Sequence, residues 1–170
     1  MPGHLVKSTG PDPDPSEFLF VSREDKMKDM AKPYDSKKDC WVPCDKDGFV
    51  LAEISKEDGD NVEVTIDCVP KMFKKDQLKP VNPPKFEKCV DCVDLTYLND
   101  ASVLYNLKAR YVAKLMYTYS GLFCIAVNPY KRYPIYTARA AKVYMGKRRN
   151  EVPPHVFAIS ENAYANMRQR

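Results

Sequence analysis

The chain has 170 residues, 44% of them hydrophobic and 29% charged, so it is long enough to fold around a core. Lys and Arg outnumber Asp and Glu by only 27 to 23, and the densest basic run is Lys147–Arg149, which argues against a nucleic-acid partner. Because the sequence has neither a run of about 20 apolar residues nor an apolar signal-peptide core, we expect a cytoplasmic protein with no membrane partner.

Two N-terminal segments precede the first strands. Residues 1–17 are predicted to form a flexible tail, because their alternating prolines and aspartates cannot enter a helix and bury little surface. A short helix is predicted within 18–33. Ser22 and Asp25 have the spacing of a capping box, and the helix should end ahead of Pro33.

Residues 34–80 alternate apolar and polar side chains with the period of strands that have one buried face. The apolar positions of two successive runs are Val50, Ala52, Ile54 and then Val62, Val64, Ile66, Cys68. Asp-Gly pairs at 47–48 and 58–59 mark turns beside these runs. Four or five short strands of this kind predict a small β-barrel, with Trp41 in its core.

Residues 81–88 are predicted to form an extended linker, because prolines fix the backbone and exclude helix. Later elements are expected as a helix at 101–114, strands at 115–119 and 122–127, and helices at 137–144 and 155–168. The apolar stripe is expected at Val103, Leu104, Leu107 and Tyr111 in the first of these helices, and at Val156, Ile159, Ala163 and Met167 in the last. The second strand is apolar on both faces, which is typical of a strand inside a larger sheet.

Patterns of catalytic and metal-binding residues are missing from the sequence. A phosphate-binding loop needs several glycines and then Lys and a hydroxyl, whereas Gly146-Lys147 is followed by another basic residue. The six cysteines are expected as free thiols. Cys89 and Cys92 have zinc-knuckle spacing but lack a matching second knuckle, so buried thiols are favoured over zinc. His155 is expected to cap or pack, and we predict no catalytic residue and no metal site.

The loop at 128–136 is rich in aromatic and basic side chains. Its Asn-Pro pair ends the preceding strand abruptly, and the loop presents amide, phenol and guanidinium groups that can recognise a ligand edge. Its tyrosines, at 130, 133 and 136, can equally pack against the sheet. Spacing alone favours packing.

Three runs resemble the myosin motor domain and occur in the family order: LTYLNDASVLYNL at 95–107, YTYSGLFCIAVNPYKRYPIY at 117–136 and GKRRNEVPPHVFAISENAY at 146–164. The resemblance is nearest to muscle-type conventional (class II) heavy chains of invertebrates. It implies a mixed α+β and α/β fold with a short N-terminal helix and a Src-homology-type β-barrel. Residues 89–170 would then form the first helices and strands of a P-loop-type motor ATPase core.

The same resemblance implies a ligand and partners. Asn128, Pro129, Arg132 and Tyr136 match the positions that line the adenine pocket in that family, with the Tyr136 hydroxyl offered to the base. The implied cofactor is ATP, held with magnesium in the complete motor. The family couples ATP hydrolysis to movement on actin, so the implied partners are actin, myosin light chains and a second heavy chain, in the thick filament of the myofibril.

In that family the phosphate-binding loop follows shortly after the end of the present sequence. The chain alone is therefore expected to supply adenine-side binding and scaffolding and to be inactive as an ATPase. The alternative is a non-catalytic interaction module in which the barrel recruits a peptide. A peptide-binding barrel should expose an aromatic groove, and the few aromatics of this region, Trp41, Phe49 and Phe73, count against it.

Overall fold

The computed structural model describes residues 12–169. Its helices are α1 (Ser16–Leu19), α2 (Arg23–Met30), α3 (Asp100–Val112), α4 (Ala138–Tyr144) and α5 (Val156–Arg168). Its strands are β1 (Asp39–Cys44), β2 (Gly48–Asp58), β3 (Asn61–Ile66), β4 (Val69–Lys74), β5 (Lys79–Pro80), β6 (Tyr117–Ser120) and β7 (Phe123–Ala126).

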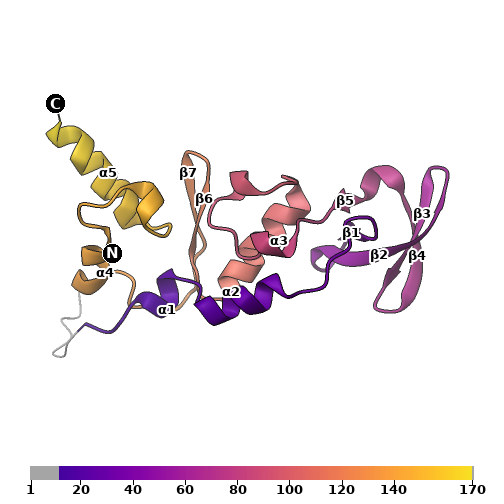
Figure 1. Cartoon of the computed structure of the whole chain (residues 1–170), viewed down its shortest axis with the longest axis horizontal. Coiled ribbons are helices and arrows are strands. Elements are labelled where there is room, and N and C mark those ends of the chain that lie inside the picture. The colour runs from indigo at the N-terminus through magenta and orange to yellow at the C-terminus, as the bar shows by residue number, and fades with distance from the viewer. Residues whose placement is uncertain (1–11, 170) are drawn as a thin grey trace.

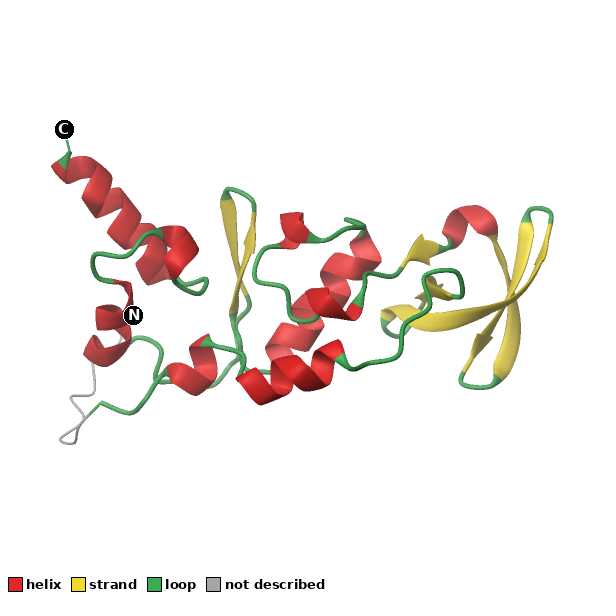
Figure 2. Ribbon diagram, viewed as in Figure 1, coloured by secondary structure: helices red, strands yellow, loops and turns green. Residues whose placement is uncertain are grey.

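The elements are strung out along one long axis (Figure 1). The sheet formed by β1–β5 lies at one end, α2 and α3 lie in the middle beside the β6–β7 hairpin, and α4 and α5 lie at the other end (Figure 2). Within residues 12–169 we find no helix with the length and apolar character needed to cross a membrane.

Helix starts are set by local sequence. Four helices begin after a side chain that accepts a backbone N–H: Ser22, Asn99, Thr137 and His155. The Ser22 hydroxyl accepts from the Asp25 N–H at 3.0 Å and donates to the Asp25 carboxylate at 2.7 Å. Such caps satisfy N–H groups that have no partner inside the helix, so the predicted start of α2 is confirmed.

The predicted tail over residues 1–17 falls largely outside the described residues, and its end is wrong. Helix α1 begins at Ser16, whose N–H and hydroxyl both donate to Asp14, at 3.0 and 2.7 Å. The helix buries Leu19 in a cluster with Ile135 and Tyr144, more than a hundred residues later. Contacts so distant in sequence order this segment, and no local pattern indicates them.

The first sheet is antiparallel with the strand order β4-β3-β2-β1-β5, in which β1–β4 form a meander and β5 returns to pair with β1. Its core contains the alternating positions predicted from the sequence except Cys68, together with residues of β1, β4 and the turn before β5: Cys40, Val42, Val50, Ala52, Ile54, Val62, Val64, Ile66, Phe73 and Leu78. The alternation therefore identified the buried face correctly, because successive side chains of a strand point to opposite faces.

Three details differ from the prediction. Trp41 is buried, but it lies between core residues 40 and 42 and its ring contacts Tyr105 of α3 at 4.9 Å, outside the sheet core. Cys68 leaves the buried face because it occupies the turn between β3 and β4 with φ of 66°. The segment 81–88 is half-buried and contains a 3₁₀ turn at Pro84–Phe86, since proline is tolerated in the first turn of a helix.

The buried face of helix α3 is largely polar, whereas the sequence predicted an apolar one. Its fully buried side chains are Ala101, Ser102, Asn106 and Arg110. Of the predicted stripe, Val103, Leu104 and Leu107 are only half-buried and Tyr111 is exposed. The helix packs against the segment 88–92 and β6, whose buried backbone carbonyls need hydrogen-bond donors. Asn106 donates to the Cys89 carbonyl, and Arg110 donates to the carbonyls of Lys88 and Tyr117.

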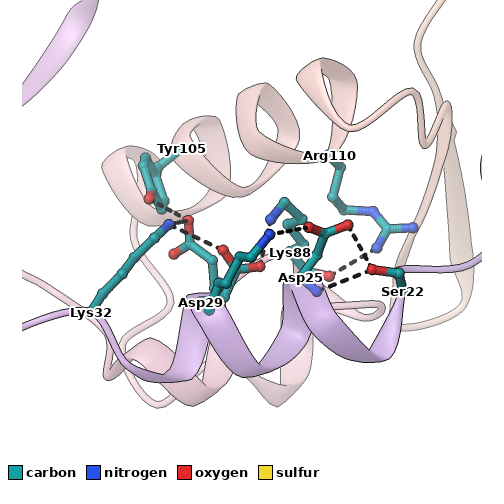
Figure 3. A network of polar contacts seen from close by, with 9 residues as sticks. Ser22, Asp25, Asp29, Lys32, Lys88, Tyr105 and Arg110 are labelled. Carbon is teal, nitrogen blue, oxygen red and sulfur yellow. Dashed lines mark hydrogen bonds and ion pairs between the residues drawn. The ribbon is translucent and has the colours of Figure 1, made fainter.

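A network of polar contacts joins α2, α3 and the segment between them (Figure 3). Asp29 of α2 pairs with Lys88 at 2.5 Å and with Lys32 at 3.3 Å. Lys32 also pairs with Glu87 at 2.6 Å, and Tyr105 of α3 donates to the same carboxylate at 2.5 Å. Charged residues from three segments thus meet in one partly buried cluster, where ion pairs are screened less than on the surface.

The second sheet is the β6–β7 hairpin, whose tip is exposed. Leu122 is 91% exposed and Phe123 is 75% exposed. The apolar stripe predicted for α5 also faces outward in the described chain, since Val156, Ile159, Ala163 and Met167 are all exposed and Ala158 is the buried residue. These apolar residues are the kind that a larger sheet or a neighbouring element would cover.

Candidate functional site

The loop after β7 is shaped by two local bonds. The Val127 N–H donates to the Met116 carbonyl at 2.9 Å and keeps the chain beside β6. The Asn128 side-chain oxygen then accepts from the Tyr130 N–H at 2.9 Å, which closes an Asx turn, and Tyr130 has φ of 51°. The Asn-Pro pair therefore turns the chain sharply, as the sequence predicted.

The return of the loop is held by packing. Tyr133 stacks on Phe18 of the N-terminal segment at 4.7 Å and 29°. Ile135 is buried in the cluster that contains Leu19. The Thr137 hydroxyl accepts from the Ala140 N–H at 3.2 Å and starts α4. The loop is thus fixed at both ends, which is the condition for a preorganised site.

A cavity of about 300 Å³ lies between this loop and the hairpin. Its lining includes Asn128, Pro129 and Tyr136, together with Met116, Tyr117, Ala126, Val127, Lys131, Tyr133 and Ile135. Three of the four predicted site residues therefore share one cavity. Arg132 is exposed and is not among the lining residues.

Tyr136 is 59% exposed, and its hydroxyl lies 2.7 Å from that of Tyr117. Burial raises the pKa of Tyr117 above its ordinary value, and the bond to Tyr136 raises it further, so the Tyr117 phenol is neutral near pH 7. One hydroxyl donates to the other. Because a phenol both donates and accepts, the pair keeps capacity for a further hydrogen bond to a ligand.

The His155 ring packs against the Tyr136 ring. The two rings are 5.4 Å apart, and Tyr117 and Tyr144 also contact the imidazole, at 4.6 and 5.2 Å. Its Nδ1 accepts from the Phe157 N–H at 3.1 Å, which assigns the proton to Nε2. Burial lowers the pKa of His155 to about 4, so the ring is neutral at pH 7. The histidine is a helix cap and packing residue, as the sequence predicted.

Sequence reasoning identified three of the ten lining residues, and Tyr117 and Lys131 are among those that it missed. Tyr117 pairs with Ala126 across the hairpin, so the strand register places it beside the loop that follows β7. This register was available from the hairpin pattern and could have indicated Tyr117. Lys131 supplies the cation in the lining, next to Arg132 in the sequence.

The Gly146-Lys147 pair is not arranged as a phosphate cradle. The Gly146 N–H donates to the Glu161 carboxylate at 2.9 Å, which places a negative charge where a phosphate would need a positive one. The six cysteines are free thiols, and burial raises the pKa of Cys89 and Cys92. Over residues 12–169, we find no cluster of three or more His, Cys, Asp or Glu side chains suited to a metal ion.

Comparison with known proteins gives matches over both halves of the chain. Residues 26–82 match the myosin N-terminal SH3-like domain, and residues 89–170 match the myosin head (motor domain). The chain is 56% identical over 153 residues to Myosin-3 of Caenorhabditis briggsae and 55% identical to Myosin-3 of Caenorhabditis elegans; each alignment covers 89% of this chain. It is 52% identical over 155 residues to Myosin-1 of Caenorhabditis elegans, which covers 90% of the chain.

The chain spans about 8% of the length of these curated relatives. The two matched regions follow one another in the order that the sequence motifs predicted, and the observed sheet and helices have the mixed α and β content expected of them. These similarities confirm the resemblance to an amino-terminal segment of a class II heavy chain. The chain belongs to the myosin family, with an N-terminal SH3-like domain followed by part of the motor domain.

Proposed function

We propose that the cavity beside the Asn-Pro loop binds the adenine base of ATP in a complete myosin motor. Asn128, Pro129 and Tyr136 would form its wall and its polar edge, and Arg132 would approach from the exposed side of the loop. The motor would couple ATP hydrolysis to movement on actin. Its partners would be actin, light chains and a second heavy chain, in the cytoplasm and in the thick filament of muscle.

The observation that supports this proposal most is the convergence of Asn128, Pro129 and Tyr136 on one cavity beside a fixed hydroxyl pair. A flat aromatic base fits between apolar walls and a few placed polar groups, which is the usual make-up of a ligand pocket. A volume of about 300 Å³ is near the lower end for small-molecule sites, so it suits the base better than a whole nucleotide.

The phosphates and the magnesium ion would be held elsewhere in the motor. Because phosphate contacts carry most of the affinity in such sites, the 170-residue chain by itself should bind Mg-ATP at most very weakly and should not hydrolyse it. Titration calorimetry checks the binding, and a micromolar dissociation constant for the isolated chain would contradict this expectation.

The test of base recognition is Tyr136→Phe in a complete motor domain that carries this segment. If the hydroxyl contacts the base, ATP should bind more weakly by about 0.5–1.5 kcal/mol, with the hydrolysis step nearly unchanged. A purine riboside triphosphate, whose base lacks the amino group, should lose less. Stopped-flow binding and single-turnover hydrolysis separate the two quantities.

The matched control is Tyr117→Phe, which removes the hydroxyl that pairs with Tyr136 but leaves the Tyr136 phenol in place. It should have the smaller effect on ATP. Asn128→Ala opens the Asx turn at Tyr130, and its effect should not add to that of Tyr136→Phe, because both residues belong to one loop. Equal weakening of every triphosphate would show that the loop only packs against the hairpin.

A further inference from the structure

Two Asp-Gly pairs flank β2 and differ in what surrounds them. Asp47 and Gly48 lie at the start of this strand, and Asp58 and Gly59 lie at its end. They are the only places in the sequence where Asp or Asn precedes glycine. An aspartyl side chain can react with the backbone nitrogen of the next residue, and glycine favours this reaction because it has no Cβ to hinder the approach. The chain therefore contains two sites of the same chemistry whose surroundings can be compared.

The turn at Asp58-Gly59 is a tight β-hairpin turn. Asp58 pairs with Asn61 across the hairpin, so Gly59 and Asp60 alone form the turn. Gly59 has φ of 60°, whereas the φ of Asp60 is negative, which is the type II′ pattern with glycine at the first central position. In such a turn the backbone hydrogen bond joins the two flanking residues and does not use the Gly59 N–H. The nitrogen that would react is therefore not engaged by the turn.

The same turn is open to solvent. Residues 55–61 are all exposed, and a Cβ at Gly59 would have no other atom within 4 Å. The neighbouring Lys75 is already engaged, because its ammonium pairs with Glu57 at 3.1 Å and its N–H donates to the Asp60 carbonyl at 2.9 Å. Segments with exposed backbone and few contacts open most readily. The Asp58 side chain is thus free to rotate onto the Gly59 nitrogen.

The pair at Asp47-Gly48 is held by helix α3. Lys108 lies 3.6 Å from the Asp47 carboxylate and donates to the Asp47 carbonyl at 2.8 Å. A Cβ at Gly48 would lie 2.9 Å from the Leu104 side chain, so the helix packs closely against this glycine. Gly48 also pairs with Cys44 in the sheet. The contacts with Lys108 must break before the Asp47 carboxyl can move onto the Gly48 nitrogen.

We propose that Asp58 is a site of spontaneous isomerisation to isoaspartate and that α3 protects Asp47 from the same reaction in the folded chain. The Gly59 nitrogen attacks the side-chain carbonyl carbon of Asp58, a C–N bond forms, and the carboxyl OH leaves with the amide proton as water. Water then adds to the resulting ring at the former backbone carbonyl, and the C–N bond there breaks. The product has one extra methylene in the backbone and a free α-carboxyl group.

The product no longer fits the turn. An extra backbone atom in a two-residue turn is incompatible with the pairing of Asp58 with Asn61. Val62 and Val64 are fully buried and hold the rest of β3, so the loss of pairing should stay at the tip of the hairpin. We therefore expect faster amide hydrogen exchange in the isomerised chain, confined to residues 56–61.

The experiment ages the whole 170-residue chain at pH 7 and physiological temperature for several weeks in H₂¹⁸O. Each ring opening places one ¹⁸O atom in the product, so digestion in ordinary water and mass spectrometry measure the reaction at each site. Fragmentation then distinguishes isoaspartate from aspartate. Asp58 should react roughly tenfold faster than Asp47, because an ion pair and a hydrogen bond must break at Asp47 first. In guanidinium chloride, where α3 is unfolded, the two rates should become similar.

Lys108→Met keeps a good helix former on α3 and removes both contacts with Asp47. It should speed the reaction at Asp47 and leave the rate at Asp58 unchanged. The matched control is Lys142→Met, which removes an exposed lysine from α4 instead. Because α4 contributes no contact to either Asp-Gly pair, this control should leave both rates unchanged.

Four outcomes would overturn the proposal. They are the absence of ¹⁸O and isoaspartate at position 58, equal rates at the two sites in the folded chain, the same ratio of rates in guanidinium chloride as in the folded chain, and an unchanged rate at Asp47 in Lys108→Met. The first three use the unaltered chain, so they decide the matter even if Lys108→Met does not fold.

Discussion

Single residues at the loop show how burial sets protonation. His155 is surrounded by Tyr117, Tyr136, Tyr144 and Phe157, and it caps α5 with a neutral ring. Burial disfavours the charged imidazolium, which lowers the pKa to about 4 from an ordinary 6.5. The facing phenols of Tyr117 and Tyr144 keep their protons throughout this range, because burial raises their pKa values.

We therefore predict that the chain becomes less stable between pH 7 and pH 5. In this interval the unfolded chain takes up a proton on His155 that the folded chain does not, so protonation favours unfolding, with a loss on the order of 2 kcal/mol. Chemical denaturation at the two pH values measures it. His155→Asn retains a good helix cap and should lack this part of the pH dependence; an unchanged slope in the variant would contradict the assignment.

At the scale of elements, helix α3 is held through polar rather than apolar contacts. Arg110 is 2% exposed, and its guanidinium donates to the Thr118 hydroxyl and to the carbonyls of Lys88 and Tyr117, at 2.8, 2.9 and 2.7 Å. Burial lowers its pKa to about 10, so it remains charged at pH 7. One side chain thus connects the helix to β6 and to the segment that pairs with α2.

Arg110→Lys should lower the free energy of unfolding by about 2–4 kcal/mol, because a single ammonium cannot reach three acceptors in the fixed geometry of a guanidinium. Urea denaturation measures the loss. Arg139→Lys is the control: Arg139 is half exposed and pairs with Asp14 at the surface, so the same substitution should change stability by less than about 0.5 kcal/mol. Similar losses in both variants would show that Arg110 stabilises the fold no more than a surface arginine does.

At the scale of the whole molecule, the sheet and the helical part differ in how their contacts are distributed along the chain. Each pair among β1–β4 joins neighbouring strands through short turns, so most contacts of this part are local in sequence. The cluster around Leu19 and Ile135, by contrast, joins the two ends of the described chain. The sheet therefore needs little from the later residues, whereas the N-terminal helices depend on them.

Residues 34–80 should accordingly fold when expressed alone, and the fragment should show a cooperative thermal transition and β-type circular dichroism. Its Trp41 fluorescence should lie at longer wavelength than in the 170-residue chain, because Tyr105 and α3 no longer cover the indole. A fragment without a cooperative transition would show that the sheet depends on α3. An unshifted spectrum would show that α3 does not shield the ring.

Much of this organisation was predictable from local pattern. Two-residue alternation identified the core positions from Val50 to Val64, and Ser22, Asn99, Thr137 and His155 set the helix starts within a residue or two. These features follow from backbone periodicity and from the few atoms next to a helix end, so neighbouring residues suffice to specify them. The Asn-Pro turn belongs to the same class, because Asn128 closes it within three residues.

By itself, the sequence determined the strands, the caps, the sharp loop and, through its motifs, the family. Only the tertiary structure decided which faces are covered: that Trp41 faces α3, that α3 buries Asn106 and Arg110 rather than its apolar stripe, and that α1 forms at all. It also decided that Lys131 and Tyr117, and not Arg132, line the loop cavity. The physical reason is that burial depends on elements distant in the chain, whose approach no local period or spacing encodes.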